Sequence, residues 1–407
     1  MTVIFLLLFG GAAGAGDFDR WREQLWSDAE KRGIKRQLFD EATNVPLDLT
    51  LPDLALPNRP TNEQAEFGRL PADYISRQQI SALAAKGRQY LSTYRRVLAE
   101  TEAKYGVPGH VIIAIWGRET DYGSERERHY VIPSLLTLAY HGKRKDQFRE
   151  ELLIALELVQ EGKMRRDAVG SWTGAMGHTQ FEPSDIRKFA VDGDGDGKID
   201  LINSIPDALA SAGKQLHDYG WRRARKWAIE VRLSPNVSCV ESSSTVERTL
   251  AEWLDLGAFP ASRMGVSIDM LDEPAILLMP AGIYGPAFLA FENFKVFRRY
   301  NQSDNYAIFV GHLADRIAGG SDFETPWTKL PLINTREVLD IQQMLQGSGD
   351  YTGAIDGRLG SATRRAIGMF QQRLGLKVDC WVSSALLNSG RGKTTAPGTS
   401  PAGAASR

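Results

Sequence analysis

Hydrophobic side chains recur every three to four residues along much of the chain, which is the spacing that predicts α-helices with one buried face. The pattern predicts helices over residues 17–39, 80–105, 147–160 and 307–317. A further helix is predicted to begin at Pro108, and short β-rich pieces at residues 227–233 and 275–279 predict a small appended sheet. The predicted fold class is therefore mainly α (α+β).

The run VIIAIWGRETDYG, residues 111–123, carries the first candidate for chemistry. Pro108 suits a first helical turn, and Gly123 is a plausible stop. At helical spacing Glu119 shares a face with Trp116 and the isoleucines before it, so a carboxyl group ends an apolar stripe. Burial and the negative end of a helix dipole both raise a carboxyl pKa, so Glu119 is predicted to be a general acid. The alternative is that it pairs with a neighbouring arginine and only stabilises the helix.

A glycine-rich segment, SWTGAMGHTQFEPSD at residues 171–185, predicts an irregular loop. Backbone without Cβ atoms lets a ligand approach closely. Ser171 and Gln180 can donate hydrogen bonds to hydroxyl and acetamide groups, and Phe181 offers a flat face to a sugar ring. Composition alone fits a substrate loop and a tight packing turn between helices equally well.

An acidic segment, VDGDGDGKIDLINSIPD, follows this loop. Asp192, Asp194 and Asp196 stand at alternate positions, Gly197 follows for a sharp turn, and the Lys198 carbonyl is the next candidate oxygen ligand. This order matches the first half of a calcium-binding loop. Because three carboxylates this close repel one another, a bound metal is favoured over a plain acidic turn.

The second half of that loop departs from the usual pattern. Asn203 stands at the twelfth position, where a bidentate carboxylate is expected, so Asp200, or Asp207 from a lengthened loop, would have to replace it. Every candidate ligand is local in sequence. The metal is therefore predicted to be structural.

Composition and charge exclude some classes of protein. The chain has 407 residues, of which 43% are hydrophobic and 24% charged, so it is expected to fold into two or more globular domains. Its formal net charge of -1 creates no basic field that would attract nucleic acid.

The N-terminus and the cysteines bear on the compartment. The apolar residues 3–9, followed by small residues, have the form of a secretory signal ending near residue 16, although the usual basic residues are missing. The alternative is a buried N-terminal segment; the run is too short to span a bilayer. No cysteine follows it to carry a lipid anchor. Cys239 and Cys380 either form one bridge in an oxidising compartment or remain two unpaired thiols, and their spacing is not that of a metal site.

Three ordered motifs together resemble the lytic murein transglycosylases of the B type. They are VPGHVIIAIWGRETDYGS, the loop SWTGAMGHTQFEPSD with the acidic segment behind it, and GPAFLAFENFKVFRRYNQSDNYAIFVGHLADRI. The likeness covers residues 67–317. Members of this family cleave the MurNAc–GlcNAc β-1,4 bond of peptidoglycan on a lysozyme-like helical core with a calcium loop. The resemblance implies that fold and activity, a structural calcium ion and no catalytic cofactor.

The resemblance also implies roles for individual residues, with Glu119 at the position of the acid/base glutamate. It implies substrate contacts at Arg144, Ser171, Gln180, Tyr300 and Tyr306. It implies metal ligands at Asp192, Asp194, Asp196, Asp207 and the carbonyl of Lys198. The chain departs from the family at Thr120, where serine is commoner, at His178, where tyrosine is expected, and at Lys143, which replaces one of two adjacent arginines. These departures are expected to alter substrate affinity rather than the reaction.

A single acid is sufficient for the implied reaction. Glycosidases ordinarily use two carboxylates, but in substrate-assisted enzymes the substrate acetamide replaces the second. The resemblance implies that Glu119 protonates the leaving oxygen and then takes the proton of the C6 hydroxyl, which gives a 1,6-anhydro end without water. Asp121 is predicted to point away on the same helix, and Glu182 lies on a loop of unknown direction. The spacing of these residues does not itself exclude hydrolysis.

A second unit follows Pro326 and Pro331. Its apolar positions form two helical stripes, at Val338, Ile341 and Leu345 and at Ala366, Phe370 and Leu374. The segment AIDGRLGSATRRAIGMFQQRLGLKVD resembles the small three-helix peptidoglycan-binding domain, with Cys380 in place of the glycine usual after Asp379. That last turn is expected to differ from the family. The alternative is a packing domain without a ligand.

These features predict a signal peptide at residues 1–16, a catalytic region at 17–325, a peptidoglycan-binding domain at 326–390 and a disordered tail at 391–407. The expected protein is a soluble periplasmic enzyme whose partner is the glycan strand of peptidoglycan, with no membrane span and no lipid anchor. The competing hypothesis is a noncatalytic peptidoglycan-binding scaffold. A calcium sensor would need a second calcium loop, which the sequence lacks.

Overall fold

The computed structural model of the chain describes residues 12–55, 69–125, 128–262, 266–331, 333–383 and 386. The apolar run of the predicted signal peptide and the predicted tail lie outside these residues. The chain forms two compact units, a first unit within residues 1–63, 78–224 and 312–320 and a second unit within residues 64–77, 225–311 and 321–407. The domain boundaries proposed from sequence stay a prediction.

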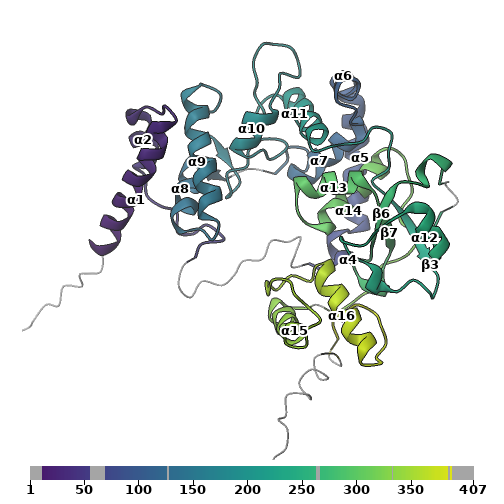
Figure 1. Ribbon diagram of the computed structural model, residues 1–407. Helices are drawn as coiled ribbons and strands as arrows, with labels where there is room; N and C mark the ends of the chain where they lie inside the picture. Colours follow the sequence, from purple (N-terminus) through teal and green to yellow (C-terminus); the bar gives the residue numbers. More distant parts are fainter. Residues whose placement is uncertain are drawn as a thin grey trace, which may run out of the picture. The chain divides into compact units, whose positions relative to one another are not determined.

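The first unit is built mainly from α-helices (Figure 1). In chain order they are α1 (Ala12–Lys31), α2 (Arg36–Thr43), α5 (Arg77–Thr93), α6 (Arg95–Tyr105), α7 (Gly109–Thr120), α8 (Val131–His141), α9 (Lys145–Gln160), α10 (Pro183–Phe189) and α11 (Ile205–Asp218). Two short antiparallel strands, β1 (His129–Tyr130) and β2 (Val169–Gly170), pair before the glycine-rich loop.

Two long helices predicted from the pattern are each divided in two. The prediction of one helix over residues 17–39 is wrong, because α1 ends at Lys31 and Gly33 takes a left-handed conformation, with φ 74°, before α2 begins. The segment predicted as residues 80–105 forms α5 and α6, which are separated at Tyr94, the N-cap of α6. The apolar pattern continues across both breaks, which is why it did not reveal them.

The core of the first unit lies around α8 and α9, which pack on each other. Most of α8 is buried, and α9 buries the stripe predicted for it, including Phe148 and Leu152, which are fully inaccessible. Leu25 of α1 and Phe39 of α2 belong to the same cluster. Burial of such side chains contributes about 1.5–3 kcal/mol each relative to leaving them exposed.

Within the described residues, no helix combines the length and apolar character needed to cross a bilayer.

The second unit contains a five-stranded antiparallel sheet in the order β4-β6-β7-β3-β5. Its strands are β3 (Ala228–Leu233), β4 (Glu247–Thr249), β5 (Ala258–Pro260), β6 (Pro274–Leu278) and β7 (Ala287–Ala290). Its helices are α4 (Pro71–Tyr74), α12 (Leu250–Leu256), α13 (Glu292–Tyr300) and α14 (Asp304–Ile317), the last ending in the first unit, with short 3-10 turns η1 (Cys239–Glu241), η2 (Ile268–Met270) and η3 (Gly282–Tyr284). The appended sheet predicted from the two β-rich pieces is confirmed.

The C-terminal module of the second unit contains α15 (Thr335–Gly347) and α16 (Ser361–Arg373). Asn334 and Glu337 form a reciprocal capping box at the start of α15. Both predicted stripes are confirmed, since Ile341, Leu345 and Phe370 lie in one buried cluster.

The C-terminal module is linked by a disulfide bond and a hydrogen bond to the part of the second unit that contains the sheet. Cys239 and Cys380 form a disulfide bond, which decides between the bridge and the two thiols left open by the sequence. The hydroxyl of Tyr284 donates to Asp379 at 2.7 Å. Cys380 has a φ of 54°, a left-handed conformation that favours glycine, and this explains why glycine is usual there.

Candidate functional site

Glu119 lies in the last turn of α7 and is half-buried. The stripe before it is buried as predicted, with Ile112 and Ile115 inaccessible and Trp116 1% exposed. The helix ends at Thr120 rather than at Gly123, because residues 121–123 all take left-handed φ values of 45°, 60° and 80°. A carboxyl group therefore stands at the C-terminal end of an apolar helix, next to a sharp change in chain direction.

Asp121 lies just beyond the end of α7, so the prediction that it points away from Glu119 on the same helix is wrong. It is the C-cap of α7, and its carboxylate pairs with Lys86 of α5 at 2.9 Å. Asp121 is still expected to be a poor second catalytic carboxylate, but for a different reason: its charge is balanced by Lys86.

Aromatic rings pack against α7 on the side of Trp116. The ring of Tyr90 lies 4.8 Å from that of Trp116 and 5.0 Å from that of Tyr122. Tyr94 meets Trp116 edge-on at 5.7 Å. Burial raises the pKa of Tyr122, which stays a neutral hydrogen-bond donor. These rings fix the face of α7 that precedes Glu119.

The glycine-rich segment forms an irregular loop up to Pro183, where α10 begins. The Ser171 hydroxyl accepts from the amide of Ala175 at 3.1 Å, and the Gln180 side chain donates to the Gly177 carbonyl at 3.0 Å. Gln180 takes a left-handed φ of 54°. Phe181 is fully buried, so the prediction that it offers its face to a sugar ring is wrong.

Hydrogen bonds join this loop to the last turn of α7. Trp116 Nε1 donates to His178 Nδ1 at 3.1 Å, and the Thr120 hydroxyl donates to the His178 carbonyl at 2.9 Å. Burial lowers the pKa of His178 and favours the neutral ring. Two of the three positions that depart from the family, Thr120 and His178, are therefore in direct contact, which the sequence did not indicate.

Three carboxyl groups gather where the loop enters α10. Burial, followed by the charges of Glu151 and Asp185, raises the pKa of Glu182 to about 7. Burial likewise raises the pKa of Asp185 to about 6 and raises that of Glu151. The Glu151 carboxylate accepts from the amide of Ser184 at 2.9 Å. This cluster was not predicted from the sequence, because Glu151 lies on an otherwise apolar face of α9.

Arg144 lies at the N-cap of α9, with its side chain 44% exposed. Its guanidinium stands over the ring of Phe148 at 4.8 Å and pairs with Asp53 at 3.4 Å. Lys143 pairs with the other oxygen of Asp53 at 3.7 Å. The charge of Arg144 also acts on Glu182, whose pKa it lowers against the larger raising causes. Arg144 thus presents a cation on the same unit as Glu119.

Tyr300 and Tyr306 belong to the second unit. Their rings are stacked, with centroids 6.3 Å apart and an interplanar angle of 10°. Tyr306 is 2% exposed. Tyr300 ends α13 and Tyr306 lies in the first turn of α14, so the two aromatic residues predicted as substrate contacts form one pair, in which Tyr306 is buried.

The acidic loop brings together Asp192, Asp194 and Asp196, with one oxygen of each within 4.8 Å of the others. Backbone amides donate to all three carboxylates, for instance Gly197 to Asp192 at 2.8 Å, and such bonds lower the pKa of Asp192. Gly195 and Gly197 take the left-handed φ values of 81° and 84° that the tight loop requires. An exposed set of carboxylate oxygens suits a hard cation such as calcium.

The other two predicted metal ligands are placed differently. Asp207 is 1% exposed, and its two oxygens accept from the amides of Gly193 at 2.7 Å and Asp200 at 2.8 Å. It thereby ties both ends of the acidic loop to the start of α11. Lys198 donates its amide to Asp196 at 2.8 Å. Their metal-ligand roles stay predictions.

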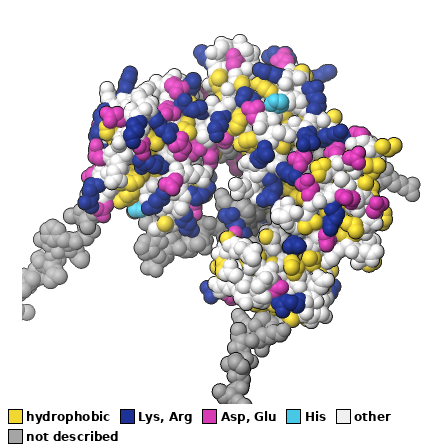
Figure 2. Space-filling model, viewed as in Figure 1, with side chains coloured by type: hydrophobic (Ala, Val, Ile, Leu, Met, Phe, Trp, Pro, Cys, Tyr) yellow, Lys and Arg dark blue, Asp and Glu magenta, His cyan; other side chains and the backbone are white. Residues whose placement is uncertain are grey.

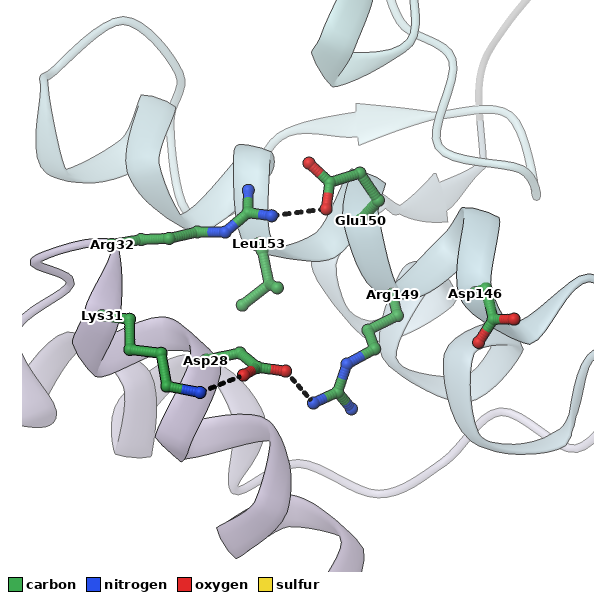
Figure 3. Close-up of a pocket in the computed structure, with 7 residues that line it drawn as sticks. All are labelled: Asp28, Lys31, Arg32, Asp146, Arg149, Glu150 and Leu153. Carbon is green, nitrogen blue, oxygen red and sulfur yellow. Dashed lines mark hydrogen bonds and ion pairs between the residues drawn. The ribbon is translucent and has the colours of Figure 1, made fainter.

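A depression of about 240 Å³ lies between α1 and α9, apart from these residues (Figure 3). Five of its six charged side chains pair with one another: Asp28 with Lys31 and Arg149, and Arg32 with Glu150. Positive and negative side chains are likewise intermixed over the face of the molecule shown in Figure 2. We therefore interpret the depression as a solvated network of ion pairs between α1 and α9.

The chain is similar in sequence and fold to known proteins. The family model described as the transglycosylase SLT domain matches residues 17–315, and a peptidoglycan binding domain model matches residues 334–388. The crystal structure of SltB3 from Pseudomonas aeruginosa in complex with NAG-anhNAM-pentapeptide is 35% identical, with a TM-score of 0.81, over 92% of this chain and 99% of that chain.

Two matches from Escherichia coli are more distant. Membrane-bound lytic murein transglycosylase B is 25% identical over 298 residues, 71% of this chain and 80% of that protein. Lytic transglycosylase Slt35, solved in complex with calcium, is 26% identical with a TM-score of 0.52, over 61% of this chain and 77% of that chain. The predicted fold class, a lysozyme-like helical core with a small β-containing appendage and a helical C-terminal module, is confirmed. The chain belongs to the SLT-domain family of lytic murein transglycosylases.

Proposed function

We propose that the chain cleaves the MurNAc–GlcNAc β-1,4 bond of peptidoglycan and leaves a 1,6-anhydro end. The observation that carries the proposal is the half-buried carboxyl group of Glu119, which lies in the last turn of the apolar helix α7. Asp121, two residues further on, is engaged in an ion pair with Lys86. A relative that is 35% identical was solved with an anhydro-sugar pentapeptide. Together these features support a reaction in which one glutamate serves twice.

In this proposal Glu119 first donates its proton to the departing glycosidic oxygen. The substrate N-acetyl group shields the developing positive charge, as in other substrate-assisted glycosidases. Glu119 then accepts the proton of the C6 hydroxyl, whose oxygen closes onto C1. The proton lost in the first step is thus regained in the second, and no water is consumed.

The proposed substrate contacts have complementary chemistry. Ser171 and Gln180 supply hydrogen-bonding groups on a loop with little side-chain bulk, and Arg144 supplies a cation for an anionic group of the wall. Tyr300, which is partly exposed, supplies a ring whose face suits sugar C–H groups, and the buried Tyr306 stacks on it. On the first unit, Arg144, Ser171 and Gln180 would then hold the sugar chain while Glu119 acts at one bond.

We also propose a calcium ion held by Asp192, Asp194 and Asp196, with the Lys198 carbonyl and Asp207 completing the loop. The three exposed carboxylates within 4.8 Å fit such an ion, and the relative Slt35 was solved with calcium. When bound, calcium would neutralise their mutual repulsion and stabilise the loop. It would take no part in the chemical step.

The compartment proposed is the periplasm. The disulfide between Cys239 and Cys380 is the kind of bond that persists in an oxidising compartment outside the cytosol. The peptidoglycan binding domain match at residues 334–388 supports a C-terminal module that holds the enzyme on its polymer.

Digestion of purified sacculi tests the activity. Wild-type protein should release soluble muropeptides whose mass is one water below that of hydrolysed reducing ends. Glu119→Gln should lose this release by at least about 10²-fold, the effect of removing a general acid. The matched control is Glu100→Gln, which makes the same change on an exposed face of α6. Binding of sacculi by wild-type protein without any release would support the noncatalytic scaffold instead.

A further inference from the structure

We infer that His178 is a positioning residue that holds the last turn of α7, and with it Glu119, against the glycine-rich loop. This inference rests on the proposed function and adds to it a residue with no assigned role. His178 contacts α7 on both sides of Glu119, at Trp116 and at Thr120.

The first contact is between two side chains. An indole N–H can only donate, so His178 Nδ1 must accept the bond from Trp116 at 3.1 Å and must carry no proton. The two rings meet edge to face, with centroids 5.4 Å apart and an angle of 85°. Trp116 is 1% exposed and packed among tyrosine rings, so it is a fixed donor. The His178 ring is therefore held in one orientation and one tautomer.

The second contact runs from a side chain to the backbone. The buried hydroxyl of Thr120 donates to the His178 carbonyl at 2.9 Å and accepts from the amide of Gly123 at 3.0 Å. Space around this junction is tight, because a Cβ atom on Gly123 would lie 2.9 Å from the His178 ring. The left-handed segment after Glu119 is thus tied to the same loop residue.

The opposite side of His178 is also fixed. Its amide donates to the carbonyl of Leu201 at 3.3 Å. At Gly177, a Cβ atom would lie 2.3 Å from that carbonyl, and φ is 72°, so only glycine lets the chains approach this closely. The loop residue that contacts α7 therefore cannot shift freely away from it.

These contacts matter for catalysis because Glu119 lies in a helix-terminal turn, where backbone carbonyls lack partners within the helix and the turn can fray. A displacement of about 1 Å in a catalytic group can lower the rate by about 10²-fold. The same loop carries Ser171 and Gln180, so the junction at His178 sets the acid and the proposed substrate contacts relative to each other. Loss of the junction should therefore lower kcat more than it changes KM.

The test compares variants that differ in one hydrogen bond. His178→Phe keeps a ring but removes the hydrogen-bond acceptor. His178→Asn keeps an acceptor, because the amide oxygen of asparagine is bonded to Cγ, as Nδ1 is in histidine. Thr120→Val removes the hydroxyl at nearly constant volume, and Thr120→Ser retains it. kcat and KM would be measured on purified sacculi by mass detection of anhydro products, with the thermal midpoint of each variant recorded.

His178→Phe and Thr120→Val are expected to lower kcat by about 10- to 100-fold with KM within about twofold. His178→Asn and Thr120→Ser are expected to recover most of that loss, and all four variants should unfold within a few degrees of wild type. Unchanged kcat in His178→Phe, or an equal loss in His178→Asn, would overturn the positioning role. A wild-type protein that binds sacculi but releases nothing would overturn the proposed function itself, a result distinct from a loss confined to the variants.

Discussion

The hydroxyl of Tyr122 donates to the main-chain carbonyl of Leu83 at 2.8 Å, and this bond joins the segment after Glu119 to α5. Tyr122 is 5% exposed and has a φ of 60°, a conformation that costs a residue other than glycine about 1 kcal/mol or more. The aromatic contacts around it offset that cost. The backbone turn beside the proposed acid is thus held by a buried ring.

Gly117→Ala is expected to disturb this arrangement. A Cβ atom at Gly117 would lie 2.6 Å from Cζ and from the hydroxyl oxygen of Tyr122, so the ring must move. We expect a loss of about 2 kcal/mol in the free energy of unfolding of the first unit, measured by denaturant titration. Gly347→Ala is the control, because nothing lies within 4 Å of a Cβ atom at that helix end. Equal stability of the two variants would contradict the tight packing.

The carboxyl cluster at α10 predicts a pH dependence of stability. The pKa of Glu182 rises from an ordinary 4.5 to about 7 on folding, and that of Asp185 from 3.8 to about 6. Between these limits the folded chain binds more protons than the unfolded chain, so the free energy of unfolding falls as pH rises toward 7. The stability that these two carboxyl groups contribute is fully present below their unfolded pKa values of 4.5 and 3.8. It is lost as pH rises through the folded-state values of about 7 and about 6.

Glu182→Gln is therefore expected to be more stable than wild type at pH 8 by about 1 kcal/mol, with the difference vanishing near pH 4, below the unfolded pKa. Denaturant titrations at pH 4, 6, 7 and 8 would measure the difference. Glu161→Gln is the control, because Lys163 and Arg187 lower the pKa of that exposed carboxyl, and its loss should not stabilise the chain at pH 8. A pH-independent effect of Glu182→Gln would count against the cluster.

Calcium is expected to raise the thermal midpoint of wild-type protein that has been treated with a chelator, because an ion that binds only the folded loop stabilises it. Asp196→Asn should reduce that rise and leave the calcium-free protein nearly unchanged, since Asp196 is exposed. Asp207→Asn should destabilise the calcium-free protein by about 1–3 kcal/mol, because a buried acceptor of two amide bonds is altered. No response to calcium in wild type would refute the site.

The sequence was informative where a pattern has one structural solution. The apolar stripe before Glu119, the two stripes of the C-terminal module and the β-rich pieces all formed the predicted elements. It failed where a single backbone angle decides, as at Gly33, because the apolar spacing continues across the break. Phe181 was misread because an aromatic residue in a glycine-rich loop can face either a ligand or the core, and the loop folds back between Met176 and Phe181.

The site itself was predicted residue by residue but not in its connections. Nothing in the spacing indicates that His178 meets Trp116, 62 residues earlier, or that Glu151 joins Glu182. Such contacts depend on how distant elements pack. The disulfide was undecided for the same reason, since its cysteines are 141 residues apart.

Removal of the disulfide is expected to lower the free energy of unfolding of the second unit by about 2–4 kcal/mol. The variant combines Cys239→Ser with Cys380→Ser, and wild type treated with a reductant should behave alike. Cys239→Ser combined with Cys380→Gly should recover about 1 kcal/mol, because position 380 has a φ of 54°. Wild type that unfolds identically with and without reductant would contradict this stabilising role.

The two compact units are interleaved along the chain, since the second takes residues 64–77 before most of the first and the first takes residues 312–320 after most of the second. Each unit consists of three segments, so a gene fragment that encodes either unit alone would need two internal joins. During synthesis, the first unit is complete only after residues 312–320 are made, and the second only after residues 321–407 are made. Exchange of whole units between related proteins by a single crossover would leave both incomplete, so evolution by recombination is restricted to smaller pieces such as the C-terminal module.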